Sequence, residues 1–215
     1  IPFVILFVNS SALIFSLCVH EFSHGIVAYY YGDDTAYKYG RLTLNPLKHL
    51  DPMGSLMLLF IGFGYAKPVP VNTFNLNNPR QDIIKVAAAG PISNLILAFF
   101  GYFLMYFIFT FMPNIFNESI HLFFRIFIQI NIYLAIFNLI PVYPLDGGQI
   151  FGNFISKYYP NFNKNLFVYG PRILLGMILI GFLSGFSIIS LFLQPFYYIV
   201  DTLFNFIISL FFNLF

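Results

Sequence analysis

The chain has 215 residues, of which 59% are hydrophobic and only 8% are charged, and its formal net charge at pH 7 is +2. Its mean hydropathy is +0.81, whereas a soluble domain carries roughly 25% charged residues. Such a chain cannot cover a water-facing surface, which excludes an ordinary soluble domain and indicates that a lipid bilayer is its solvent. The basic residues are scattered between apolar segments, so a basic patch for nucleic acid is excluded as well.

Five apolar segments are long enough to cross a membrane. A hydrocarbon core of about 30 Å requires a helix of about 20 residues, and the segments lie, in chain order, at 1–31, 83–111, 121–140, 173–193 and 196–215. Gly32-Asp33-Asp34 ends the first segment, and Gln194-Pro195 predicts a tight break between the last two. We therefore predict an all-α polytopic membrane protein of about five to six transmembrane helices, forming one domain over residues 1–215.

Two shorter segments follow the first span. Residues 53–63 are apolar but too short to cross the membrane, which indicates a re-entrant or interfacial piece. Residues 65–72 contain Pro68 and Pro70, which exclude a central β-strand and favour an extended connection. We expect this re-entrant and extended region to lie near the functional site.

The most informative pattern is His20-Glu21-Phe22-Ser23-His24, inside the first span. Two residues four positions apart on a helix lie on one face, about one turn apart. Both imidazoles can therefore reach one metal ion, and Glu21 then lies beside the open coordination position of that ion. The alternative for Glu21 is a buried carboxylate paired with a cation, but the first span contains no Lys or Arg.

The basic residues orient the predicted helices. Lys and Arg occur in or beside the connection after the first span, at positions 38, 41, 48, 67, 80 and 85, and after the third span, at positions 157, 164 and 172. The connections at 113–119 and 194–195 hold none. The positive-inside rule then places the two long connections in the cytoplasm. The histidine pair would lie below the membrane surface, nearer the cytosol.

A catalytic zinc site usually keeps three protein ligands and one open position, so a third ligand is needed. Glu118 is a poor candidate because it belongs to the short connection on the opposite side. Asp146 follows the third span at its cytoplasmic end, after Pro141 and Pro144 and before glycines that let the backbone pass close to a metal. An ionisable residue at membrane depth indicates function. The alternative is that Asp146 caps a short helix that begins near Gly147.

In combination, these motifs resemble the site-2 protease family of intramembrane zinc metalloproteases, in its compact prokaryotic branch without a PDZ domain. The resemblance covers nearly the whole chain. It rests on the His20–His24 motif, Leu145-Asp146-Gly147, Gly90-Pro91-Ile92-Ser93-Asn94, and the segments 40–46, 51–54 and 66–72. It implies one Zn²⁺ per chain, held by His20, His24 and Asp146. It also implies hydrolysis of peptide bonds within or beside the transmembrane segments of membrane proteins.

Roles follow for further residues. Glu21 is expected to act as the general base on water. Asn94 is expected to bind the substrate carbonyl or the developing oxyanion, with an interhelical hydrogen bond as the alternative, and Asn138 has the same two readings. Residues 65–72 are either an edge to which an unwound substrate adds a strand or an ordered connector. The expected partners are membrane-protein substrates and the bilayer, in a prokaryotic cell (inner) membrane, with the active site towards the cytoplasm.

Two other classes of membrane protein carry similar residues. A prenyl-protein protease needs a glutamate ligand in a later span, and the only glutamates of the chain are Glu21 and Glu118. A transporter or a non-proteolytic zinc-binding protein lines an ion path with buried His, Glu and Asp. It would not need Glu21 directly after His20, nor a glycine-flanked Asp146. We therefore interpret the chain as a zinc-dependent metalloendopeptidase.

Overall fold

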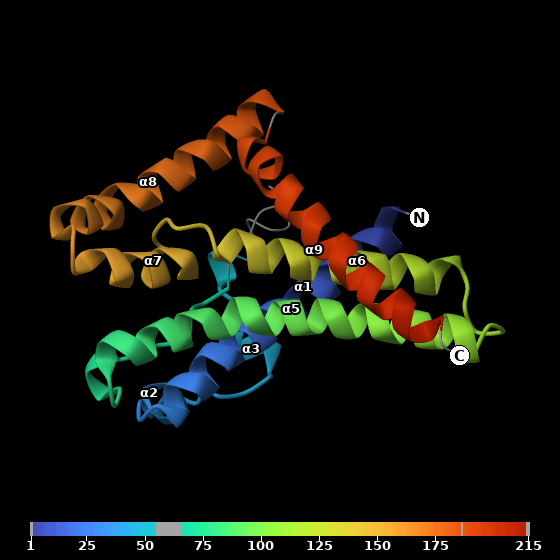
Figure 1. Ribbon diagram of the computed structural model, residues 1–215, viewed down its shortest axis with the longest axis horizontal. Helices are drawn as coiled ribbons and strands as arrows, with labels where there is room; N and C mark the ends of the chain where they lie inside the picture. Colours follow the sequence, from blue (N-terminus) through green and yellow to red (C-terminus); the bar gives the residue numbers. More distant parts are fainter. Residues whose placement is uncertain (1, 55–65, 186, 214–215) are drawn as a thin grey trace.

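The computed structural model describes residues 2–54, 66–185 and 187–213 (Figure 1). These residues form helices and no strand, apart from an isolated β-bridge between Leu50 and Ala66. The helices are α1 (Pro2–Tyr30), α2 (Thr35–Lys38), α3 (Pro46–His49), the 3₁₀ helix η1 (Thr73–Asn75), α5 (Pro79–Phe111), α6 (Glu118–Asn138), α7 (Asp146–Ser156), α8 (Pro160–Ser184) and α9 (Ile188–Phe212). The prediction of an all-α protein is confirmed.

Five of the described helices are long and apolar enough to cross a membrane. They are α5, α6, α8, α9 and, within α1, the segment Asn9–Tyr30. This confirms the prediction of a polytopic integral membrane protein, and the first three predicted spans correspond to α1, α5 and α6. The predicted re-entrant piece at 53–63 lies outside the described residues, except for its first two positions.

The long helix α5 runs through the middle of the bundle (Figure 1). It packs along α1 and α6 and also contacts α7 and α9. Small residues allow close approach, because a Cβ atom on Gly101 would lie only 2.9 Å from the side chain of Ile128 on α6. Buried residues fill the space between α5, α6 and α9: Ala98, Tyr102, Phe124, Ile128, Ile132, Ile208 and Phe212.

The turn between α6 and α7 determines where Asp146 lies. Pro141 and Pro144 lack the N–H group that would continue α6. Asp146 is the first residue of α7, and Leu145, at the N-cap position, makes no side-chain cap. A Cβ atom on Gly147 would lie 2.2 Å from the carbonyl oxygen of the C-cap residue of α6. Glycine therefore lets α7 start directly against the end of α6, and Asp146 is held inside the bundle.

The last two helices depart from the sequence prediction. Helix α8 ends at Ser184 and α9 begins at Ile188, so the break predicted at Gln194-Pro195 is wrong. Gly185 ends α8 in the left-handed conformation, with φ of 70°, which glycine adopts without steric cost. The Ser187 side chain then caps α9 by accepting from the N–H of Ser190. The proline lies inside α9, which membrane helices tolerate.

Helix α9 runs alongside α5 in the same direction. The Tyr102 hydroxyl donates to Asp201 at 2.6 Å and the Tyr106 hydroxyl donates to Asn205 at 2.7 Å, so a step of four residues along α5 matches a step of four along α9. Figure 1 shows the C-terminal ends of both helices on one side of the molecule, whereas α8 meets α9 well away from that side. The last two helices are therefore not an antiparallel pair packed along their length.

Residues 66–72 form an extended segment beside α1. The Arg41 guanidinium donates to the carbonyl oxygen of Lys67 at 2.6 Å, and the N–H of Asn72 donates to the Asp33 carboxylate at 2.7 Å. A third hydrogen bond joins the middle of the segment to the histidine motif of α1. The extended region thus lies next to the functional motif, as the sequence predicts.

Replacing Asp33 by alanine should release this extended segment. Asp33 is 0% exposed and accepts hydrogen bonds from Thr35, Asn72 and Asn75. A buried donor left without its acceptor costs roughly 1–3 kcal/mol. We therefore expect faster amide hydrogen exchange in residues 66–75, measured by mass spectrometry of the protein in detergent or nanodiscs.

Asp34→Ala is the matched control, because it removes only a surface ion pair with Lys38 and should leave exchange unchanged. Acid should act like the Asp33 substitution. Burial by itself raises the pKa of Asp33, but the hydrogen bonds hold it below its ordinary value. A carboxylate with a lowered pKa stabilises the fold above its unfolded pKa and loses this effect as pH falls through the folded pKa. Equal hydrogen exchange in the Asp33→Ala and Asp34→Ala proteins would contradict the role of Asp33 in anchoring the extended segment.

Candidate metal centre

The three side chains predicted as metal ligands converge on one point. His20 and His24 project from the same face of α1, and their Nε2 atoms lie 3.0 Å apart. Oδ2 of Asp146 lies 3.2 Å from Nε2 of His20 and 3.4 Å from Nε2 of His24. In the part of the chain that the structure describes, this is the group of His, Cys, Asp or Glu side chains whose atoms could share a metal ion.

The spacing of these donor atoms fits a tetrahedral ion. An ion about 2.0–2.1 Å from each ligand in tetrahedral geometry places the ligands roughly 3.3 Å from one another. All three residues are buried, and Oδ2 of Asp146 has no hydrogen-bond partner, although an unpaired buried acceptor is costly. Two imidazoles and one carboxylate leave a fourth position open, as zinc-type catalytic sites do.

Helix α5 holds the outer nitrogen of each histidine. Nδ1 of His20 donates to Oδ1 of Asn94 at 2.6 Å, and Nδ1 of His24 donates to the backbone carbonyl of Val86 at 2.7 Å. A carbonyl oxygen only accepts, so both protons lie on Nδ1 and both Nε2 lone pairs face the centre. A Cβ atom on Gly90 would lie 2.4 Å from Nε2 of His24. Only glycine therefore leaves room for the two rings.

A buried polar network supports Asn94 in turn. Its Nδ2 donates to Oδ1 of Asn131 on α6 at 2.9 Å and to the carbonyl of Ser16 on α1 at 3.3 Å. The Asn131 amide donates to the Ser16 hydroxyl at 2.9 Å, and all three residues are 0% exposed. Both amide protons of Asn94 are thus engaged, which favours a role in positioning His20 over binding of a substrate carbonyl. Sequence reasoning missed Asn131 and Ser16, although polar residues inside an apolar span are a signal.

Glu21 lies beside the histidines and finds its partner on the extended segment. The N–H of Val69 donates to Oε2 of Glu21 at 2.8 Å. Glu21 is half-buried and makes no ion pair with the described residues. The alternative of a carboxylate paired with a cation therefore has no support in this part of the chain. The second carboxylate oxygen stays available to a water molecule.

Two other residues considered from the sequence lie outside the cluster. The Asn138 amide donates to the carbonyl of Leu134 within α6, at 3.0 Å, and its Oδ1 has no partner among the described residues. A hydrogen bond to another helix and binding of a substrate carbonyl thus both stay predictions for the role of Asn138. Glu118 is the first residue of α6, at the end of that helix opposite to Asp146, which agrees with its exclusion as a ligand.

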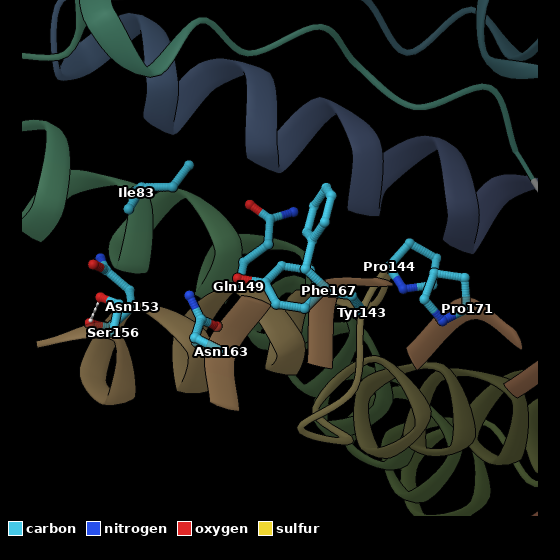
Figure 2. Close-up of a pocket in the computed structure, with 10 residues that line it drawn as sticks. Ile83, Tyr143, Pro144, Gln149, Asn153, Ser156, Asn163, Phe167 and Pro171 are labelled. Carbon is cyan, nitrogen blue, oxygen red and sulfur yellow. Dashed lines mark hydrogen bonds between the residues drawn. The ribbon is translucent and has the colours of Figure 1, made fainter. Parts of the chain in front are cut away.

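A cavity of about 540 Å³ lies between α7, α8 and the start of α5 (Figure 2). Pro144 and Gln149, on either side of Asp146 in the sequence, line it together with Tyr143 and Phe167. None of its lining residues is Asp, Glu, Lys or Arg. The cavity is therefore an uncharged space lined in part by the chain on both sides of Asp146, and none of the three ligand residues is part of its lining.

Comparison with known proteins agrees with the site. The model of peptidase family M50 matches residues 9–117 and 108–180. The chain belongs to this family. Its membership confirms the resemblance to the site-2 proteases that the histidine, Asn94 and Asp146 motifs predict. No solved structure matches the chain significantly.

Several relatives of this M50 family member are named zinc metalloproteases. "Putative zinc metalloprotease YwhC" of Bacillus subtilis is 50% identical over 141 residues, which cover 64% of each chain. Rip2 of Mycolicibacterium smegmatis, named in the same way, is 41% identical over 88 residues, covering 39% of this chain and 34% of its own. MJ0611 of Methanocaldococcus jannaschii, also so named, is 29% identical over 162 residues, covering 70% of this chain and 76% of its own.

Replacing Asn131 by leucine should weaken metal binding although Asn131 is not a ligand. Leucine has a similar size but cannot accept from Asn94, so the support of His20 is lost. Loss of a partner that orients a metal-bound histidine typically costs 10–100-fold in metal affinity. We expect a loss of about that size, measured by competition with a chelator in detergent. Asn138→Leu is the control on the same helix, and an equal loss there would contradict the network's role.

Proposed function

We propose that the chain is an intramembrane zinc metalloprotease that hydrolyses peptide bonds within or beside transmembrane segments of membrane-protein substrates. The convergence of His20, His24 and Asp146, with Glu21 beside them, carries the proposal. The family membership and the names of the relatives support both zinc and peptide hydrolysis. The zinc motif lies within a helix apolar enough to cross a bilayer, which supports action on membrane substrates.

His20, His24 and Asp146 would hold one Zn²⁺, which as a Lewis acid would lower the pKa of a water bound at the open position. Glu21 then accepts a proton from the attacking water and returns it to the leaving amine nitrogen. Val69 fixes one oxygen of Glu21 and leaves the other for this transfer. Asn94 keeps the His20 ring in the orientation that directs Nε2 to the centre.

The substrate would bind in an extended form. A helix has no free backbone groups, so cleavage requires local unwinding, and the extended segment 66–72 can then pair with the unwound chain. The uncharged cavity beside Asp146 (Figure 2) gives neighbouring apolar or neutral residues of the substrate a place to bind.

We further propose that the active site lies towards the cytoplasm of a prokaryotic cell membrane. The basic residues at positions 38–85 and 157–172 adjoin the ends of helices that lead to the histidine motif and to Asp146. His24 lies six residues before the end of α1, which is about 9 Å along a helix. The zinc would thus lie just below the membrane surface.

Replacing Glu21 by glutamine should abolish cleavage and keep the metal. Glutamine has the same shape but cannot accept the proton from water, and loss of a general base costs roughly 10²–10⁴-fold in rate. We expect a loss of that size for a single-span substrate in proteoliposomes, with one zinc per chain still bound by elemental analysis.

Glu118→Gln is the matched control for this experiment, because Glu118 is the only other glutamate and begins α6 away from the centre. It should cleave like the wild type. A Glu21→Gln protein that cleaves at the wild-type rate would remove Glu21 from the mechanism. A wild-type protein that binds zinc but cleaves none of a library of single-span proteins would favour a non-proteolytic zinc-binding membrane protein or a transporter.

Replacing Val71 by proline should impair cleavage if substrate pairs with the extended segment. The N–H of Val71 makes no hydrogen bond with the described residues, so its removal costs the folded protein little but denies the substrate a donor. We expect a rise in KM of about tenfold, measured on a single-span substrate, corresponding to about one lost hydrogen bond. Val71→Ala keeps the N–H and is the control. Unchanged KM in the proline variant would leave the segment as an ordered connector.

A further inference from the structure

A second group of polar side chains lies inside the helix bundle, away from the metal centre. Helices α5, α6 and α9 enclose a cavity of about 390 Å³ whose lining includes Arg125 and Asp201. Tyr102, also in the lining, follows Asn94 by eight residues along α5, or about 12 Å. Ionisable residues within membrane helices are costly and indicate function. The proposed proteolytic chemistry uses neither Arg125 nor Asp201.

The two charged groups have different surroundings. Oδ1 of Asp201 accepts from the hydroxyls of Tyr102 at 2.6 Å and Tyr197 at 3.0 Å, whereas Oδ2 accepts no hydrogen bond from the described residues. Arg125 is exposed and makes neither a hydrogen bond nor an ion pair in the same part of the chain. The cavity therefore offers a fixed acceptor, the Asp201 carboxylate, and an unused donor, the Arg125 guanidinium.

Part of the lining of this cavity lies on the surface of the protein. Arg125, Gln129, Gln194 and Tyr198 all line it and are all exposed. They lie within α6 and α9, both of membrane-spanning length, so the apolar lipid interior would surround them. Polar groups without partners are unfavourable there. A polar partner at membrane depth must bring its own backbone hydrogen bonds satisfied, and a transmembrane helix does so.

We propose that this cavity is a docking site for a transmembrane helix of another protein, which inserts an Asn or Gln side chain between Arg125 and Asp201. A carboxamide fits both groups, because its oxygen accepts from the guanidinium and its NH₂ donates to the free carboxylate oxygen. A carboxylate would meet Asp201 and an ammonium would meet Arg125, each a repulsive contact. Resting on the proteolytic function proposed above, we identify this helix as that of a substrate, which the cavity would hold at a distance from the metal.

The test is a double-mutant cycle between the protein and a synthetic single-span peptide. The zinc-loaded Glu21→Gln protein, which leaves the peptide uncut, is reconstituted in bilayers, and peptide affinity is measured by energy transfer. The peptides have a Leu-rich span with one Asn placed at successive positions, or none. We expect one Asn position to bind roughly fivefold more tightly than the all-apolar peptide, in line with hydrogen bonds between membrane helices.

Arg125→Met should erase this difference, because methionine fills similar space without a donor, while the affinity of the all-apolar peptide stays unchanged. Arg172→Met is the matched control, since Arg172 is an exposed arginine on α8 outside the cavity, and it should preserve the difference. The proposal would be overturned if the protein that keeps Arg125 bound every peptide with equal affinity. It would also be overturned if the Arg125→Met protein still preferred the Asn-containing peptide. Self-association of labelled protein that Arg125→Met abolishes, with no Asn preference, would identify a second copy as the occupant instead. Cleavage of a single-span substrate by the wild-type protein is measured in parallel. Normal cleavage there would show that a failure of the docking proposal is not a failure of the proteolytic function.

Discussion

The metal centre depends on the close approach of α1 and α5 at Gly90. There the histidine rings fill the space that any side chain would occupy. The same contact brings Asn94 and the Val86 carbonyl within hydrogen-bond distance of the outer ring nitrogens. Because a bilayer supplies no water to satisfy these nitrogens, the protein must supply their partners. The partners in turn determine which nitrogen of each ring faces the metal.

The sequence predicts the local part of this arrangement well. The spacing of His20 and His24 is fixed by one turn of helix, and α1 is helical throughout that stretch. The distribution of basic residues and the prolines and glycines around Asp146 indicate its place, and these prolines and glycines do end α6 and bring α7 against it. Such features depend on neighbours in the chain, so a pattern of residues is enough to indicate them.

Contacts between helices could not be predicted in the same way. Asn131 and Asp201 each lie in a largely apolar span, and nothing nearby in the sequence says which helix each one faces. Asn131 meets Asn94 and Asp201 meets Tyr102 only because α5 packs against both α6 and α9. The sequence mispredicts the break between α8 and α9 for a related reason. Pro195 is the stronger breaker in water, but a membrane helix tolerates it, and Gly185 ends the helix instead.

The extended segment links substrate binding to the base in the proposed mechanism. Successive peptide groups of an extended chain point to opposite sides, so residues 69 and 71 direct their N–H groups to one edge. Pro68 and Pro70 occupy the alternate positions and have no N–H, and the N–H of Asn72 is bound to Asp33, which leaves the other edge without a free donor from residue 68 to residue 72. A substrate strand must therefore pair on the edge that faces Glu21, where the Val69 N–H now binds the Glu21 carboxylate. Pairing there would bring the substrate backbone beside the Glu21 carboxylate, so the same short segment positions both the substrate and the base.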